Sequence, residues 1–197
     1  MDDTNSTIAL EKSSSKQPSK WDPDSMHVSF LRRANDSNTS QCLSVREVHQ
    51  RITSGMYRTK ILEIREGRES ARAKSGEELK SAEERIRSMK EELPAVMWSG
   101  TFKKRGDANL DTYSGLVCAD LDHLEGKRSN RLFGQFRNHP YAVLGFRSPS
   151  GAGLKVVFRV AGDGGHHADN CSPVEKHLRE TYRLEAEVDP SYMTAHK

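Results

Sequence analysis

The sequence has few cysteines and no long apolar run. Cys42, Cys118 and Cys171 stand far apart, and no two of them form the Cys-x-x-Cys pair of a typical zinc site. We therefore expect reduced thiols in a cytoplasmic protein. Apolar residues never run for the roughly 18 positions that a membrane helix needs. The first residues are acidic and serine-rich, which is not the pattern of a signal peptide.

Hydrophobic residues are also scarce, at 34% of the 197 residues, and the mean hydropathy is −0.79. So polar a chain indicates that part of it is solvated or disordered. Residues 1–25 hold few apolar side chains, and we predict a disordered tail there, ahead of one domain over 26–197. The net charge of +3 and the pI of about 8.7 permit contact with nucleic acid without requiring it.

The first half of the domain is predicted to be mainly helical. Ser44 and Glu47 fit a capping box, in which each side chain satisfies a backbone N–H of the other residue. Over 79–93, apolar residues recur at spacings of three and four until Pro94, which is typical of an amphipathic helix. The predicted elements are a strand at 27–31, a helix from Ser44 to Gly55, a short helix through Tyr57, Ile61 and Ile64, a charged loop at 65–78, a helix at 79–93 and a strand at 95–102.

The second half alternates strands and helices more regularly. The dipeptide Ser172-Pro173 is a typical helix start, because proline suits the first helical position. The resulting β-α-β-β-α-β order is that of the ferredoxin-like fold, which RNA-recognition domains share. We therefore predict the α+β class with a ferredoxin-like core behind a mainly helical N-terminal half. The predicted elements are a strand at 115–121, a helix at 128–138, strands at 141–147 and 154–160, a helix from 172 to about 182 and a strand at 184–189.

An apolar stretch ends in Asp120 and Asp122. Side chains alternate between the two faces of a strand, so these two carboxylates share one face. Two carboxylates at the end of a buried strand repel each other and lose hydration, which favours a cation between them. Oxygen ligands point to Mg²⁺ or Mn²⁺. Asp-x-Asp is also common by chance, and a strand that runs into an acidic turn explains the pair equally simply.

The predicted strand order brings other groups to this pair. In a ferredoxin-like sheet the fourth, first, third and second strands are neighbours in that order, all antiparallel. The end of the first strand then lies near the start of the third and of the fourth, close to Asp189. A glycine-rich loop can turn backbone N–H groups toward phosphate, and a lysine adds positive charge. An ordinary hairpin turn explains the same loop. The predicted phosphate-binding residues are Ser148, Ser150, Gly151, Gly153 and Lys155.

Three stretches together carry a resemblance to a known family. They are Tyr-Ser-Gly-Leu-Val-Cys-Ala-Asp-Leu-Asp-His at 113–123, Phe-Arg-Ser-Pro-Ser-Gly-Ala-Gly-Leu-Lys-Val at 146–156 and Glu-Val-Asp at 187–189. With the segment at 93–102, they resemble the VirE N-terminal-type domain of bacterial mobile-element proteins over about residues 25–192. That domain is similar in turn to archaeo-eukaryotic primases and primase-polymerases. The resemblance implies a primase-like, metal-dependent nucleotidyltransferase of the kind used in DNA replication.

The resemblance also implies roles for particular residues. Asp120, Asp122 and Asp189 match the catalytic, metal-binding carboxylates, with Mg²⁺ or Mn²⁺ as cofactor. The loop before Lys155 matches the motif that contacts the phosphates of a nucleoside triphosphate. Many primases have histidine at the position of Lys155, and lysine keeps the positive charge but is no neutral donor near pH 7. The implied partners are a single-stranded nucleic acid template and a helicase-like module, with no membrane. The chain ends soon after Asp189, so we expect a truncated or degenerate copy.

Two other functions are compatible with the sequence. A catalytically inactive nucleic-acid-binding or interaction module on the same fold fits the near-neutral charge. A phosphatase of the haloacid dehalogenase type also has a strand followed by Asp-x-Asp, but it expects Gly-Thr next, where His123 and Leu124 stand here. The adjacent cations at 103–105 either meet phosphates or form ordinary protein surface.

Overall fold

The computed structural model describes residues 22–39, 41–124, 126–161, 167–184 and 187–189. The predicted disordered tail at 1–25 therefore lies mostly outside the described residues. Its last part does not, because residues 23–25 form a turn and Arg46 Nε donates to Asp24 Oδ1 at 2.8 Å. Contacts with a later helix hold this polar segment, and composition alone does not reveal them.

A small antiparallel sheet and one helix form the core of the N-terminal half. The helix α1 (Val45–Thr53) starts directly from a strand that the sequence did not predict. The predicted capping box is confirmed: Glu47 N donates to Ser44 Oγ at 3.2 Å, and Ser44 N donates to Glu47 Oε2 at 2.7 Å. The strands, in the order in which they pair, are β2 (Gln41–Ser44), β1 (His27–Leu31) and β3 (Ala95–Met97).

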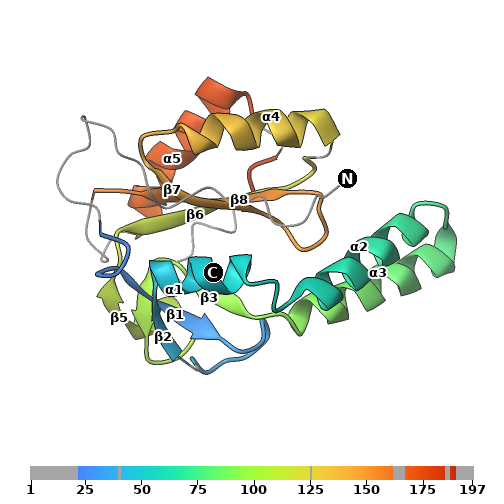
Figure 1. Ribbon diagram of the computed structural model, residues 1–197, viewed down its shortest axis with the longest axis horizontal. Coiled ribbons are helices and arrows are strands. Elements are labelled where there is room, and N and C mark those ends of the chain that lie inside the picture. Colours follow the sequence, from blue (N-terminus) through green and yellow to red (C-terminus); the bar gives the residue numbers. More distant parts are fainter. Residues whose placement is uncertain (1–21, 40, 125, 162–166, 185–186, 190–197) are drawn as a thin grey trace.

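Two long helices form a hairpin that extends from the body of the molecule, and we call it the arm (Figure 1). It consists of α2 (Arg58–Ala71) and α3 (Gly76–Glu91). The predicted loop at 65–78 is wrong over residues 65–71, which continue α2, and over 76–78, which begin α3. Only Ile64 and Ala71 of α2 are buried, in the seam between the two helices. Two apolar positions seven residues apart give too sparse a stripe to stand out among charged neighbours.

The predicted strand at 95–102 is two strands, because the chain turns after β3. The second, β4 (Gly100–Phe102), pairs with β5 (Leu110–Tyr113), which follows a short 3-10 helix at Asp107–Asn109. Gly100 makes this pairing possible, since a Cβ there would lie 2.0 Å from the carbonyl oxygen of Thr112. The close approach of two backbones, which no local pattern signals, therefore divides the predicted strand.

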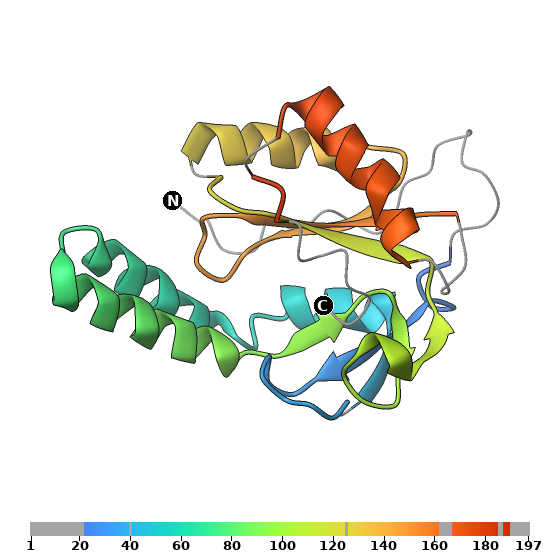
Figure 2. The same cartoon turned by 180° about the vertical axis from the view of Figure 1, so that it is seen from behind.

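The C-terminal half contains a three-stranded antiparallel sheet with two helices on one face (Figures 1 and 2). The helices are α4 (Gly126–Arg137) and α5 (His167–Tyr182), and Phe136 and Leu178 lie fully buried between them and the sheet. The order and the antiparallel directions of the three strands agree with the prediction. The strands, in pairing order, are β6 (Leu116–Leu121), β8 (Leu154–Arg159) and β7 (Ala142–Arg147).

Helix α5 begins earlier than the sequence predicts. It starts at His167 rather than Ser172, so Pro173 lies inside the helix and not in its first turn. Cys171 is fully buried and packs into the same core as Leu178. Packing of this face therefore extends the helix beyond the proline toward its N-terminus, although the proline gives up one backbone hydrogen bond there.

The predicted strand at 184–189 lies partly outside the described residues. Within the described part, Val188 forms a single antiparallel bridge with Leu121 at the free edge of β6. The chain is thus a mixed α+β protein with antiparallel sheets. No helix in the described ranges combines the length and apolar character that crossing a membrane requires.

The β6–β8–β7 sheet is the middle layer of the molecule. One face carries α4 and α5, and the other faces the N-terminal half (Figures 1 and 2). On that second face Leu116, Leu144 and Val157 pack in one cluster with Val48 and Trp98 of the N-terminal half. These contacts join the two halves at the beginning of β6. The two aspartates stand at the other end of the same strand.

Candidate metal and phosphate site

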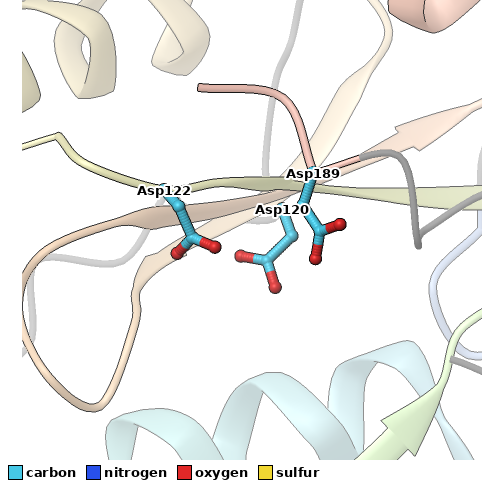
Figure 3. A group of neighbouring side chains, drawn as sticks. All are labelled: Asp120, Asp122 and Asp189. Atoms are coloured by element: carbon cyan, nitrogen blue, oxygen red, sulfur yellow. The ribbon is translucent and has the colours of Figure 1, made fainter. Parts of the chain in front are cut away.

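Three carboxylates come together at the end of β6. Asp120 and Asp122 project from one face of the strand, as the period of two predicts, and Asp189 comes from the segment beside it (Figure 3). One carboxylate oxygen from each residue lies within 4.8 Å of the other two. The structure therefore brings together the three residues that the sequence singled out as metal ligands.

Backbone pairing positions Asp189 beside the pair. Asp189 N donates to the Asp120 carbonyl oxygen at 3.0 Å, and Asp122 N donates to that of Glu187 at 2.8 Å. Between these two bonds, Leu121 and Val188 are buried in the core under α4 and α5. Because side chains alternate along both segments, burying these two apolar residues turns the neighbouring aspartates to the opposite face.

Lys155 is the cation nearest to this acidic group. It stands directly opposite Asp120 in the β6–β8 register, and its Nζ forms an ion pair with Asp120 Oδ2. The other oxygen, Oδ1, is buried and has no hydrogen-bond partner in the described part of the chain. Three carboxylates and one ammonium leave a local charge of about minus two, which one divalent cation would neutralise. An all-oxygen donor set with one unpartnered buried oxygen fits Mg²⁺ or Mn²⁺.

Burial and the excess of negative charge in this group shift the pKa values of its members. Loss of hydration, followed by the charge of Asp120, raises the pKa of the Asp122 carboxyl above its ordinary value, although Lys155 opposes the shift. Burial lowers the pKa of Lys155, but Asp120 and its neighbours outweigh burial, and the net shift is upward. Burial also raises the pKa of the Cys118 thiol, on the same face of β6, to about 12. Lys155 is thus held charged and Cys118 is held as an inert thiol.

The predicted phosphate-binding loop is the hairpin between β7 and β8. Gly151 N donates to the Ser148 carbonyl oxygen at 2.9 Å, and Ser148 N donates to that of Gly153 at 2.9 Å. The turn therefore uses the N–H of Gly151, which the prediction had directed at phosphate. Ser148 is buried, and its hydroxyl lies 3.3 Å from that of Ser150. This arrangement leaves the serine hydroxyls and Lys155 as the polar groups that face the site.

Glycine stands at positions 151 and 153 of this hairpin for two different physical reasons. Gly151 has a φ of +75°, which side chains rarely adopt. Gly153 has no such φ, and its reason is the space around it. A Cβ at Gly153 would lie 2.5 Å from the carbonyl oxygen of Leu121 and 3.2 Å from Asp122 Oδ1. Gly153 thus lets the hairpin approach the end of β6 and touch the acidic group.

A cleft of about 780 Å³ opens over this group, between the sheet and the N-terminal half. Its lining contains Asp120, Asp122 and Asp189, which are its only carboxylates among the described residues. Ser148 and Ser150 also line it. Cations from both halves of the chain complete the lining, and they are Arg51, Arg58, Arg65, Lys90, Arg105, Arg147 and Lys155.

Sequence reasoning missed the contribution of Arg65. The residue belongs to the predicted loop at 65–78, but in the structure it lies on α2, and its Nε donates to the Pro149 carbonyl oxygen at 3.4 Å. Its position seven residues after Arg58, and therefore on the same helix face, is the one signal that the sequence offers. The adjacent cations at 103–105 occupy two different environments. Lys103 and Lys104 are exposed on the surface, whereas Arg105 lines the cleft and donates to the Ala34 carbonyl oxygen.

Comparison with known proteins identifies one family. The model of the BT4734-like, N-terminal domain matches residues 88–193, which is more than half of the chain and includes all three aspartates and the β7–β8 hairpin. No curated protein and no solved structure matches the chain.

Proposed function

The chain belongs to the BT4734-like, N-terminal domain family, and we propose that it is a metal-dependent nucleotidyltransferase of the primase type. On this proposal it binds a nucleoside triphosphate and a single-stranded nucleic acid template, and it depends on Mg²⁺ or Mn²⁺. The resemblance to VirE N-terminal-type domains and to primases is one support. The other is the chemistry of the cleft.

The distribution of charge in the cleft carries the proposal. All its described carboxylates stand at the end of β6, within 4.8 Å of one another, and seven arginines and lysines stand among the otherwise mainly apolar residues of the lining. A nucleoside triphosphate with a divalent cation needs this combination, because oxygen ligands hold the metal and cations meet the phosphates that the metal leaves uncompensated. A solvated acidic turn would not require cations in the lining of the same cleft.

Each group has a role on this proposal. Asp120, Asp122 and Asp189 hold the metal, which when bound polarises phosphate oxygens and activates an attacking hydroxyl. The Ser148 and Ser150 hydroxyls donate hydrogen bonds to phosphate oxygens. The fixed charge of Lys155 orients the same phosphates, and its ion pair with Asp120 holds that side chain in position at the cleft.

We infer a finer fold and a cellular setting from the same arguments. The C-terminal half is a ferredoxin-like β-α-β-β-α-β core, which is supported by the β6–β8–β7 order and by the bridge between Leu121 and Val188. The protein acts in the cytoplasm, in the replication of a mobile genetic element and beside a helicase-like module. The resemblance alone supports the helicase-like partner.

Metal binding and nucleotide incorporation test the proposal together. Titration calorimetry with Mn²⁺ should show binding to the wild type and a loss of more than about tenfold in affinity for Asp122→Asn, since even partners outside the ligand set contribute about 10–100-fold. Asp111→Asn is the matched control, because Asp111 is an exposed aspartate of β5 outside the cleft. The same proteins are then assayed with labelled nucleotides, Mn²⁺ and single-stranded DNA or RNA templates. A wild type that binds no Mn²⁺ and incorporates no nucleotide would overturn the proposal.

The ion pair between Lys155 and Asp120 favours a second candidate, a non-catalytic nucleic-acid-binding module. The ammonium already compensates one of the three carboxylates, so the site needs less from a metal than three free aspartates would. On this alternative, Asp120→Asn and added EDTA leave binding of a single-stranded oligonucleotide unchanged, and nucleotide incorporation is absent. Release of phosphate from a generic phosphate ester would instead point to the phosphatase.

A further inference from the structure

We propose that the α2 side of the cleft, formed by Arg58, Leu62 and Arg65, is the docking surface for a single strand of nucleic acid. We call these three residues the α2 wall. The inference rests on the proposed function, because it assigns a location to the strand that the function requires. On this inference the arm is part of the binding site as well as an extension from the body of the molecule.

The geometry of α2 supplies the first argument. Positions 58, 62 and 65 follow one another at spacings of four and three, so their side chains project from one face of the helix. All three line the cleft. The two arginines are seven residues apart, which is about 10.5 Å along a helix. A stacked strand rises about 3.4 Å per nucleotide, so roughly three nucleotides span the same distance.

The charges of the arm supply the second argument. Away from the cleft several of its cations are paired with carboxylates, as in the pairs Arg72–Glu69 at 2.8 Å and Lys80–Glu77 at 2.7 Å. Arg58, in contrast, is exposed and forms no ion pair with any described carboxylate. No acidic residue of α2 lines the cleft. The part of α2 that borders the cleft thus presents arginines without carboxylates, which suits a polyanion.

Apolar exposure beside the arginines supplies the third argument. Leu62 is 38% exposed between the two arginines, and Met56, in the turn before α2, is 67% exposed. They are two of the three exposed large hydrophobic residues in the described part of the chain. Proteins that hold single strands combine cations along the backbone with apolar or aromatic surfaces against the bases. A folded duplex would bury its bases and leave these side chains in water.

The wall also ends in the right place. Arg65 Nε reaches the carbonyl oxygen of Pro149 in the β7–β8 hairpin, whose serines and Lys155 face the three aspartates. A strand that runs along the wall past Arg65 therefore arrives beside the acidic group. An acidic protein partner would gain the ion pairs but would have no reason to follow the wall into the cleft.

The test measures strand binding without metal or nucleotide. Fluorescence anisotropy of labelled oligo-dT and oligo-U, in EDTA and over a series of salt concentrations, is recorded for wild type, Arg58→Ala and the double variant Arg58→Ala/Arg65→Ala. One lost phosphate contact lowers the salt slope by about 0.7, which is about fivefold in affinity near 0.1 M salt. The single variant should lose about fivefold and the double variant about 25-fold. The two oligonucleotides distinguish DNA from RNA.

Three further variants make the result specific. Arg85→Ala is the matched control, because Arg85 is an exposed arginine of α3 outside the cleft, and its affinity should equal that of the wild type. Arg58→Lys should restore most of the affinity, since it keeps the charge. Leu62→Ser should weaken binding without changing the salt slope, because it removes an apolar contact. Circular dichroism verifies that each variant is folded.

The outcomes separate this inference from the proposed function. Unchanged affinity of the double variant, an equal loss in Arg85→Ala, or no strand binding by the wild type would each overturn the α2 wall. None of these results bears on whether Asp122→Asn loses Mn²⁺. Conversely, a wild type that binds the strand along α2 but neither metal nor nucleotide would overturn the enzyme and leave the α2 wall standing.

Discussion

Replacing Gly153 by alanine tests the close approach on which the site depends. The added Cβ would lie 2.5 Å from the carbonyl oxygen of Leu121, which belongs to the backbone of β6 and cannot rotate away. Overpacking of this kind costs about 1–3 kcal/mol, because a strand or a hairpin must shift. In a protein of this size each kcal/mol moves Tm by about 2–4 °C, so Tm should fall by about 2–12 °C.

The same methyl group should also disturb the acidic group. It would stand 3.2 Å from Asp122 Oδ1, so the shift that relieves the backbone clash also displaces a carboxylate. We therefore expect weaker Mn²⁺ binding in titration calorimetry together with the lower Tm. A lower Tm with an unchanged Mn²⁺ affinity would mean that the hairpin moves away from β6 and leaves the aspartates in place.

Gly134→Ala is the matched control. Gly134 is a residue of α4 where a Cβ would meet nothing within 4 Å outside its own helix backbone, so alanine should raise stability by up to about 1 kcal/mol through helix propensity alone. The two glycine-to-alanine changes should therefore shift Tm in opposite directions. A Gly153→Ala protein with the Tm and the Mn²⁺ affinity of the wild type would refute the argument from close approach.

Two more predictions concern charge and a buried hydrogen bond. Asp122→Asn should stabilise the protein at pH 7 in denaturation without metal: burial and Asp120 raise the pKa of this carboxyl, so its ionised form weakens the fold, and the gain should vanish as the pH falls toward 3.8. A variant that is less stable at pH 7 would contradict this sign. Ser29→Ala should cost about 1–3 kcal/mol, because the buried Phe102 N–H that donates to Ser29 Oγ at 2.8 Å loses its partner. Ser70→Ala, on the exposed surface of α2, is its control, and an equal effect of the two changes would remove the basis for this estimate.

Several parts of the fold follow from local sequence. The capping box of Ser44 and Glu47 marks the start of α1, and the apolar spacing over 79–93 finds most of α3. The alternation that ends in Asp120 and Asp122 defines β6 and places both carboxylates on one face. These features depend on the period of a helix or strand or on contacts between residues three positions apart. They can therefore be read from a short stretch of sequence.

Other features came only with the tertiary structure. The continuation of α2 through residues 65–71 depends on packing against α3, and the early start of α5 depends on the burial of Cys171. The pairing of Lys155 with Asp120 follows from the register between β6 and β8. No pattern in a single segment carries that information, because it belongs to the contact between two segments.

The candidate site shows the same division. By itself the sequence determined which carboxylates share a strand face and which hairpin carries the serines, since both are local properties of backbone geometry. Only the tertiary structure decided that Arg58 and Arg65 line the same cleft as those carboxylates and that Gly153 must lack a side chain. The reason is physical: a cleft is made by the packing of two halves, and its lining is known only once the buried apolar faces of both have been matched.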